Sequence, residues 1–274
     1  MAKIKKKKKN IPETAELVWV GSSNFGDKRM FSSIVRLVRG KKASVLGWQE
    51  GLDRTATLKR LLAYLRTWEQ YYDPQVPAAN AVPIGYDTIV WKKGVARSVL
   101  ISLRTWVGKK GAGPTFMHAK VINEIVLIHR ATGQRFRFMN LHVLPSYTRN
   151  DLPADEKAAR MREAHKMIDR LCDIVRKSKI PCIVMMDLNG TEKEAEDLYR
   201  KMKNAGLQGF TERPTLKNRA IDHVAYSHPE LVKTGSLVLV DTKSDHKTVL
   251  RPIYPIPRKE RRQIKKQMKK KRKK

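Results

Sequence analysis

Residues 180–189 read IPCIVMMDLN, and this stretch is the starting point for interpreting the fold. Ile180–Asp187 is predicted to be a buried strand, because a short apolar run bounded by proline and turn residues is typical of one. A long helix is expected before it, opened by Pro153, since apolar residues recur there at intervals of three and four. The residues of that stripe are Met161, Ala164, Ile168, Leu171 and Val175.

Further strand-like runs lie on both sides of this helix and strand. They are Glu16–Gly21, Ala43–Trp48, Tyr86–Lys92, Ala96–Leu103, Lys120–His129, Arg135–His142, Ala220–Ser227, Ser236–Val240 and Lys247–Ile253. A second helix is expected over Thr55–Tyr71, and residues 131–134 are expected to form a short hairpin connection. Many strands, few helices and mixed hairpin and crossover links predict an α/β four-layer sandwich, in which two packed mixed β-sheets are flanked by helices.

The chain of 274 residues has a formal net charge of +32, and much of this charge lies at its two ends. Six lysines and no acid occur in residues 1–10, and twelve Lys/Arg with one acid occur in residues 257–274, so the two ends hold +17. We expect disordered basic tails at 1–11 and 257–274 around one domain at 12–256. Such a charge attracts polyanions, nucleic acid first.

The two cysteines, Cys172 and Cys182, indicate no disulfide framework. No apolar run approaches the ~18 residues that a membrane helix needs, so no stable membrane insertion is expected. We expect a soluble, monomeric, cytoplasmic protein. The lysine-rich ends would also suit a nuclear address if the source is eukaryotic.

Polar side chains appear where several apolar strands end. The positions are Glu50, Asn140, His142, Asp187, Asn189, Asp222, Asp245 and His246. Each has an ordinary explanation when taken alone: Asp187 and Asn189 could form a plain turn, His142 could be a satisfied core residue, and Asp245 could cap a turn. Ionised groups at strand ends are nonetheless costly unless they are solvated, paired or bound to metal.

Phosphodiester hydrolysis accounts for all of these residue types together. Carboxylate oxygens are natural ligands for Mg²⁺ or Mn²⁺, which neutralise phosphate charge. Histidine can take a proton from water, and a carboxylate can orient its ring. Asparagine and histidine can donate to phosphoryl oxygens.

The chain also resembles the endonuclease/exonuclease/phosphatase superfamily over about residues 16–252. The segments that carry the resemblance, in order, are Ser23-Asn24-Phe25, Leu46–Glu50, Thr88–Lys92, Asn140-Leu141-His142, Asp187-Leu188-Asn189, Ala220–His223 and Ser244-Asp245-His246. None is decisive by itself, but their conjunction in this order, each beside an apolar strand, is hard to obtain by chance. The resemblance implies a deoxyribonuclease I-like fold.

By this resemblance, Glu50 is the principal metal ligand, with Asn24 and Asp245 nearby. His246 is the general base or binds the phosphate, and Asp222 orients it. Asp187 and Asn189 position water and phosphate, and His142 contacts the phosphate or helps to protonate the leaving oxygen. Two further candidates are Tyr86 as a phosphate contact and Asp87 as an acid partner of His142.

We therefore expect a Mg²⁺- or Mn²⁺-dependent phosphodiesterase acting on nucleic acid as an endonuclease or exonuclease, with DNA favoured over RNA. The alternatives are a phosphatase or lipid phosphodiesterase of the same superfamily, or a catalytically inactive nucleic-acid-binding protein. A ribosome-associated structural protein would suit the tails but would leave the acids at the strand ends unexplained.

Overall fold

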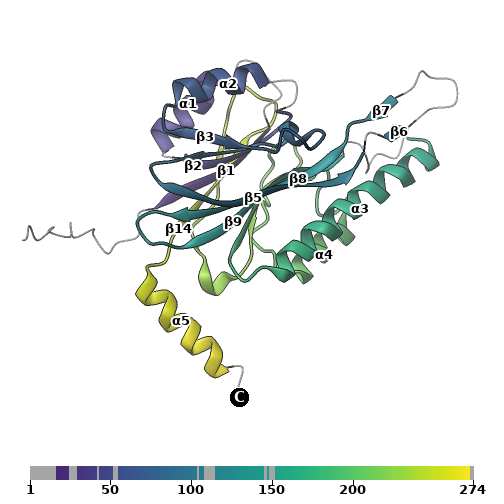
Figure 1. Cartoon of the computed structure of the whole chain (residues 1–274). Coiled ribbons are helices and arrows are strands. Elements are labelled where there is room, and N and C mark those ends of the chain that lie inside the picture. The colour runs from purple at the N-terminus through teal and green to yellow at the C-terminus, as the bar shows by residue number, and fades with distance from the viewer. Residues whose placement is uncertain are drawn as a thin grey trace, which may run out of the picture.

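The structure is a computed structural model that describes residues 17–24, 30–41, 43–51, 55–103, 105–107, 115–144, 147 and 152–271. Two large β-sheets pack face to face, and helices cover both outer sides (Figure 1). This confirms the predicted four-layer α/β sandwich. Residues 1–11, expected to form the first tail, lie outside the described part of the chain. The described helices include none that is long and apolar enough to cross a membrane.

The first sheet has seven strands in the order β12-β14-β1-β2-β4-β3, with β13 also pairing with β14. Their bounds are β1 (Val18–Asn24), β2 (Ala43–Gln49), β3 (Trp68–Tyr71), β4 (Ile84–Asp87), β12 (Lys233–Thr234), β13 (Val238–Val240) and β14 (Thr248–Tyr254). Strands β1 and β2 are parallel, whereas β14 runs antiparallel to β1. The ends of β1 and β2 and the start of β14 therefore lie at one edge.

The second sheet has five strands in the order β11-β10-β9-β8-β5. Their bounds are β5 (Trp91–Ser102), β8 (Lys120–His129), β9 (Arg135–His142), β10 (Cys182–Asp187) and β11 (Asp222–Tyr226). A separate two-stranded sheet pairs β6 (Thr105–Val107) with β7 (Thr115–Met117). Strands β9 and β10 are parallel, so their carboxyl ends also share one edge.

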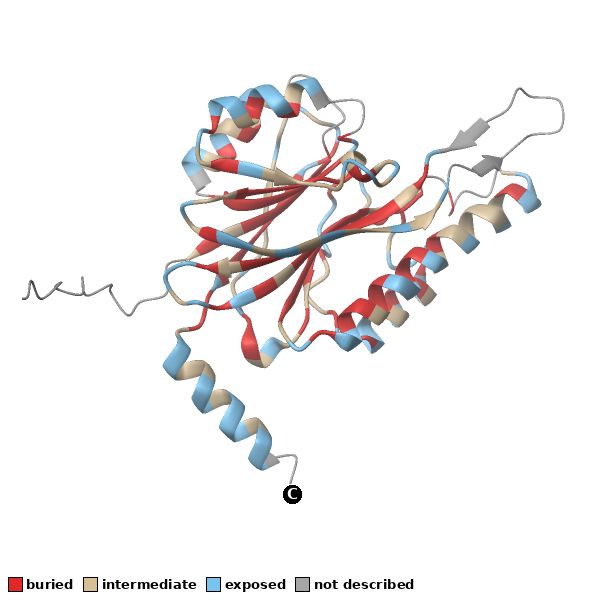
Figure 2. Cartoon of the chain, viewed as in Figure 1, coloured by how far each residue is buried: buried red, intermediate tan, exposed pale blue. Residues whose placement is uncertain are grey.

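The helices and the cores lie between and outside these sheets. The helices are α1 (Met30–Lys41), α2 (Thr55–Tyr64), α3 (Ala154–Lys177), α4 (Glu196–Asn204) and α5 (Arg258–Lys271), with short 3₁₀ turns η2 (Ala79–Ala81) and η3 (Pro229–Leu231). One apolar cluster fills the space between the sheets, a second lies under α3 and α4, and a third lies under α1 and α2. Burial accordingly follows both sheets and the inner helix faces (Figure 2).

The close approach of the two sheets depends on Asn140 of β9 and Gly47 of β2. Asn140 Nδ2 donates to the carbonyl oxygens of Trp48 and Pro83, each at 2.9 Å, and its Oδ1 accepts from Gln49 Nε2 at 2.7 Å. A Cβ at Gly47 would lie 2.7 Å from Asn140 Oδ1, closer than side chains tolerate. Glycine at position 47 therefore allows Asn140 to hold the sheets together.

Two expectations about secondary structure were wrong. The helix expected over Thr55–Tyr71 ends at Tyr64, because Trp68 pairs with Asp87 as part of β3 and stacks on Trp48. The run Tyr86–Lys92 is divided between β4 and β5 by a turn. Strand pairing and burial have overridden the helical periodicity at Trp68, whereas the turn after Asp87 forms where its carboxylate accepts from the Ile89 N–H at 3.0 Å. The predicted strands and helices also did not include α1 or α4.

The C-terminal segment differs from the expected disordered arm, since residues 258–271 form α5. Its first turns are attached to the body: Lys233 Nζ lies 2.6 Å from Glu260 Oε1, and Arg261 Nη1 donates to the Thr132 carbonyl oxygen at 3.2 Å. Beyond them the helix extends away from the sandwich (Figure 1). The division of the chain into tails and one catalytic domain stays a prediction.

Candidate active site

Strand register places three of the expected site residues in a row. Asp187, the last residue of β10, lies beside His142 at the end of β9 and beside Asp222 at the start of β11. Asp187 and Asp222 are fully buried, and the His142 side chain is 14% exposed. The two acids and the imidazole thus meet at the edge where the parallel strands end.

His246 joins this row from the other sheet. Its Nδ1 lies 2.9 Å from Asp222 Oδ2 and 3.7 Å from Asp187 Oδ2. The Ser23–Thr248 hydroxyl pair, 2.9 Å apart, ties the start of β14 to β1 and so anchors the segment that carries His246. Because Nδ1 is bonded to Asp222, Nε2 is the ring nitrogen left for chemistry.

Asn189 fixes the orientation of His142. Its Nδ2 lies 2.8 Å from His142 Nε2 and 2.9 Å from the Val143 carbonyl oxygen, and its backbone N–H donates to Asp187 Oδ1 at 2.9 Å. An amide NH₂ can only donate, so His142 Nε2 is the acceptor and the imidazole is neutral in this arrangement. The backbone of Asn189 has a φ of 52°, a left-handed conformation that asparagine tolerates better than most residues.

Glu50 and Asn24 lie on the other side of Asp187. Asn24 Nδ2 is 3.1 Å from Glu50 Oε1 and 3.3 Å from Asp187 Oδ2, so one amide links the two acids. Glu50 is exposed, and its backbone has a φ of 59°. A left-handed glutamate is uncommon and marks a turn held by its surroundings, here by Gly51 N–H bonding to the Ala81 carbonyl at 2.9 Å.

Asp245, the third expected metal ligand, occupies a different environment. It is exposed, and the hydrogen bond described for its carboxylate comes from the neighbouring Ser244 hydroxyl at 3.2 Å. Its charge nevertheless contributes to the raised pKa of His246. The structure therefore brings Glu50, Asn24, Asp187, Asn189, His142, Asp222 and His246 into linked contacts and leaves Asp245 at the margin.

Burial and charge shift the site's protonation in opposite directions at its two histidines. Burial lowers the pKa of His142 from 6.5 to about 4, and the Asp187 charge only partly opposes this. Burial would also lower the pKa of His246, but its hydrogen bond to the Asp222 carboxylate and the charges of Asp222 and Asp187 raise it to about 9. Burial raises the pKa of the Asp187 carboxyl, and the adjacent Asp222 charge adds to this rise.

The donor atoms fit a hard divalent cation. One ligand atom each from Asp187, Asp222 and His246 lie within 4.8 Å of one another. The hydrogen bond between His246 and Asp222 already occupies two of these atoms, whereas the Asn24 amide links Asp187 Oδ2 to the exposed Glu50 carboxylate. Oxygen ligands of this kind suit Mg²⁺ or Mn²⁺. Asp222 Oδ1 is buried and has no hydrogen-bond partner among the described residues, so this edge has unmet polar capacity.

Two residues at this edge were not predicted. Burial lowers the pKa of Lys120 from 10.5 to about 8, while the charges of Asp187 and Glu50 oppose the fall, so this lysine lies within electrostatic reach of the site. Its approach to the site follows from the antiparallel pairing of β8 with β9, which ends in His142. Arg219 Nη2 donates to the Asn189 carbonyl oxygen at 3.0 Å and to Glu194 Oε2 at 2.8 Å.

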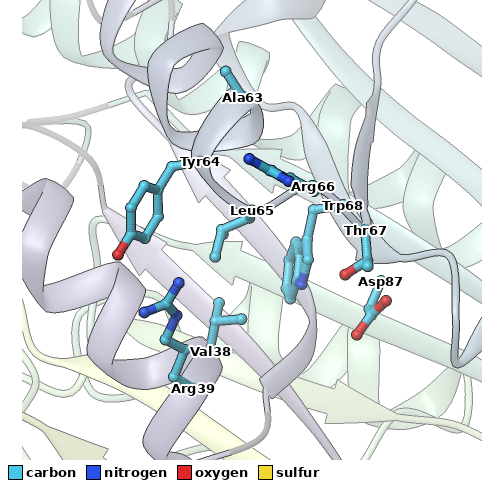
Figure 3. Close-up of a pocket in the computed structure, with 9 residues that line it drawn as sticks. All are labelled: Val38, Arg39, Ala63, Tyr64, Leu65, Arg66, Thr67, Trp68 and Asp87. Atoms are coloured by element: carbon cyan, nitrogen blue, oxygen red, sulfur yellow. The ribbon is translucent and has the colours of Figure 1, made fainter.

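Tyr86 and Asp87 do not belong to the site. Tyr86 is buried between the sheets, and its hydroxyl donates to Glu69. Asp87 lies beyond Tyr86, which pairs with Val45 near the start of β2, whereas Glu50 follows the end of that strand. Asp87 instead lines a hollow of about 520 Å³ between α1, α2 and β3, where the Arg39 guanidinium lies 4.7 Å from the centre of the Tyr64 ring (Figure 3).

Solved structures with this architecture include the human Nocturnin catalytic domain with bound sulfate anion. It is 15% identical, with a TM-score of 0.65, over 86% of this chain and 94% of that chain. The chain has the endonuclease/exonuclease/phosphatase fold. A mannosyl-6-phosphatase, Bt3783 from Bacteroides thetaiotaomicron VPI-5482, matches with 18% identity and a TM-score of 0.62, over 86% of this chain and 99% of that one.

An endonuclease/exonuclease/phosphatase family protein from Bacteroides thetaiotaomicron also matches, with 17% identity and a TM-score of 0.61, over 87% of this chain and 95% of that chain. No protein-family model matches the chain, and no curated protein matches its sequence. At these identities the likeness establishes the fold, and the predicted deoxyribonuclease I-like architecture is thereby confirmed.

Proposed function

We propose that this chain is a divalent-metal-dependent phosphodiesterase that hydrolyses nucleic acid. The observation that supports this most directly is the 2.9 Å contact between His246 and Asp222, at the edge where Asp187 and His142 meet. An imidazole held by a buried carboxylate is a group that can move a proton or bind a phosphoryl oxygen at a defined place.

His246 and Asp222 act as a pair in this proposal. Asp222 fixes the ring so that Nε2 points away from the carboxylate. Because the pKa of His246 is raised to about 9, Nε2 donates to the phosphate near neutral pH, and it takes the proton of the attacking water when the ring is in its neutral form. Asp222 also favours the charged imidazolium, which stabilises the form that exists after proton uptake. Asp222 therefore acts through His246.

Asp187 and Asn189 position water and phosphate, and His142 acts near the leaving oxygen. Asn189 has one amide NH₂ bonded to both His142 and Val143, which fixes its carbonyl oxygen relative to the Asp187 carboxylate. The neutral His142 carries its proton on Nδ1, since Nε2 accepts from Asn189. That proton is the one His142 has for a hydrogen bond to phosphate or to the leaving oxygen.

Glu50 and Asn24, with Asp187 alongside and Asp245 at the margin, are the residues that would hold Mg²⁺ or Mn²⁺. When bound there, the cation would supply neutralisation of phosphate charge and polarisation of the ester. The Asn24 amide NH₂ donates to both Glu50 and Asp187 and so holds the two carboxylates near each other.

The net charge of +32 supports nucleic acid as the substrate, with DNA expected in preference to RNA. A phosphomonoester substrate is the second candidate, because one similar structure is named a mannosyl-6-phosphatase. The two candidates share the same chemistry and differ in how much of the substrate lies beyond the attacked phosphate.

The deciding experiment incubates the full chain with supercoiled plasmid, single-stranded DNA, RNA and mannose 6-phosphate, with Mg²⁺, Mn²⁺ or EDTA. His246→Ala is the test variant, and His165→Ala, whose ring contacts Asp197 and Lys201 of α4, is the matched control. Metal-dependent cleavage of a polynucleotide that His246→Ala loses and His165→Ala keeps would support the proposal. Turnover of the sugar phosphate alone would replace it with the second candidate.

A further inference from the structure

A second cluster of charged residues lies on the outer face of the five-stranded sheet, under α3. Arg97, Arg137, Arg170 and Lys177 line a pocket of about 310 Å³ together with Asp173 and Ile174. Four cations and one carboxylate therefore face the same hollow. The volume is at the lower end of that found for small-molecule sites.

The floor of the pocket is organised by a buried carboxylate. Glu124 is 4% exposed and accepts from Arg97 Nε at 3.0 Å, from Arg97 Nη2 at 3.2 Å and from Arg137 Nη1 at 2.6 Å. This interaction holds both guanidinium groups in fixed orientations, because Glu124 cannot leave the sheet. The arginines are thereby preorganised, which lowers the entropic cost of binding a further anion.

The single negative charge of Glu124 does not balance the positive charge of the four cations that line the pocket. Asp173 Oδ1 lies 3.3 Å from Arg176 Nη1, which is not part of the pocket lining. The pocket keeps two more cations than Glu124 and Asp173 together can balance. Arg137 Nε is buried and has no hydrogen-bond partner among the described residues. A buried donor without an acceptor is costly, so this N–H would gain from an anion that accepts its hydrogen bond.

The pocket is separate from the catalytic edge. Arg137 pairs with Cys182 at the start of β10, whereas Asp187 at the end of that strand pairs with His142. Five residues of strand span about 16 Å. The two sites also lie on different faces of the sheet, because side chains alternate along β9. Arg137 shares a face with Met139, which packs under α3, whereas His142 shares a face with Phe138, which packs between the sheets. Figure 1 shows α3 on the outer side of this sheet.

We propose that Arg97, Arg137, Arg170 and Lys177 form a second binding site for phosphate groups, independent of catalysis. Guanidinium groups bind phosphate oxygens in a planar, often bidentate geometry, and Lys177 adds a point charge at the rim. Such phosphates come either from a free diphosphate or from the backbone of a bound nucleic acid. This inference does not depend on the proposed catalytic function.

The test measures binding by the full chain, without turnover. Pyrophosphate is titrated calorimetrically in EDTA against Arg170→Glu/Lys177→Glu, whose side chains are exposed on α3. The control pair, Arg162→Glu/Lys166→Glu, makes the same charge change on the same helix outside the pocket. Every protein is also measured in the His246→Ala background, so that binding at the catalytic edge is recognised separately.

The pocket variant should weaken pyrophosphate binding by about tenfold or more in both backgrounds, and the control pair should change it by less than about threefold. Asp173→Asn, which removes an acid from the lining, should tighten binding. Equal weakening by the pocket and control pairs, or unchanged affinity in the pocket variant, would overturn the proposal. The Asp173→Asn variant keeps the test decisive if the double substitution disturbs folding.

A second arm distinguishes the source of the phosphate. Fluorescence anisotropy of a labelled single-stranded 12-mer is followed over a range of salt concentrations. If the backbone of nucleic acid occupies the pocket, the pocket variant should lower the slope of log affinity against log salt by about 1 to 2 relative to the control pair. If a free diphosphate is the ligand, the two pairs should give equal slopes while the calorimetric difference remains.

Discussion

His246 Nδ1 lies 2.9 Å from Asp222 Oδ2, although the two residues are 24 positions apart and belong to segments that enter different sheets. The bond therefore crosses the interface of the sandwich at its edge. It forms only when both sheets are complete and packed, because neither segment can place its side chain alone. The candidate chemistry is in this way coupled to the folding of the whole domain.

Replacing Asp222 with Asn should reduce turnover by about 100-fold or more, because the amide no longer favours the imidazolium and can present the wrong group to Nδ1. The shape of the side chain is nearly unchanged, so the melting temperature should move little. Steady-state kinetics on the preferred polynucleotide measure the loss, and Asp155→Asn on the first turn of α3 is the control. Turnover within about twofold of the original would refute the assigned role.

Glu50→Gln should weaken Mn²⁺ binding and raise the metal concentration needed for half-maximal activity, since a charged oxygen ligand is lost. Titration calorimetry with Mn²⁺ checks this directly and needs no substrate. Asp245→Asn is the informative comparison, because Asp245 is exposed and outside the contacts that link Glu50, Asn24 and Asp187. We expect the smaller effect there. A larger effect at Asp245 would mean that the resemblance describes the metal site better than the contacts do.

Arg219→Ala should lower kcat by about tenfold with a smaller change in KM, because Arg219 holds the Asn189 carbonyl at 3.0 Å and acts only through that loop. Arg219→Lys should recover part of the rate, since an ammonium group can reach one of the two acceptors. Arg213→Ala, at an exposed neighbouring position, controls for lost charge. An Arg219→Ala enzyme with normal kcat would show that the loop keeps its position without this contact.

The strand-end residues were predictable because an acid directly after an apolar run is costly, and parallel strands bring such ends together. Asp187 illustrates this, since its place at the end of IPCIVMMD and next to His142 follows from the pattern and the parallel pairing. Lys120 and Arg219 could not be found in this way. A lysine at the start of a strand is ordinary in sequence, and its approach to the site depends on the register of β8 against β9.

Helix boundaries failed for a related reason. The apolar residues that end in Trp68 have helical spacing. Trp68 nevertheless pairs with β4 and stacks on Trp48. Both partners lie far from Trp68 in the sequence, so local periodicity could not reveal them. The arginine pocket could not be predicted from the sequence either, because Arg97, Glu124 and Arg137 lie on three different strands. Their charges alternate with polar and apolar neighbours in a way that suits any solvent-exposed strand.

The exposed lysines of α5 should contribute to nucleic-acid binding without contributing to catalysis, because α5 follows the end of β14 that lies opposite His246. Lys265, Lys266, Lys269 and Lys270 changed together to Gln should lower the slope of log affinity against log salt by up to about 3. Cleavage of a short substrate at saturation should stay unchanged. A matched set of four exposed lysines, Lys59, Lys92, Lys193 and Lys243, controls for net charge, and equal slopes for the two sets would refute a specific role for α5.

Folding stability should fall as the pH drops below about 6.5, and His223 should be one cause. Burial lowers the pKa of His223 from 6.5 to about 3. Its Nδ1 accepts from the Thr211 N–H at 3.0 Å, and its Nε2 lies 2.7 Å from the Tyr199 hydroxyl, which donates to Gly190. A second ring proton, on Nδ1, would therefore point at the Thr211 N–H, which is itself a donor.

Between pH 6.5 and 3 the unfolded chain consequently binds one more proton at this residue than the folded chain does. Stability present above pH 6.5 is lost with decreasing pH, at up to about 1.4 kcal/mol per pH unit for one proton. Urea unfolding at pH 7, 6 and 5 should give a shallower pH dependence for His223→Gln than for the original chain, whatever its absolute stability. Parallel curves for the two proteins would show that the acid sensitivity arises elsewhere, with His142, whose pKa is also lowered by burial, as the next residue to replace.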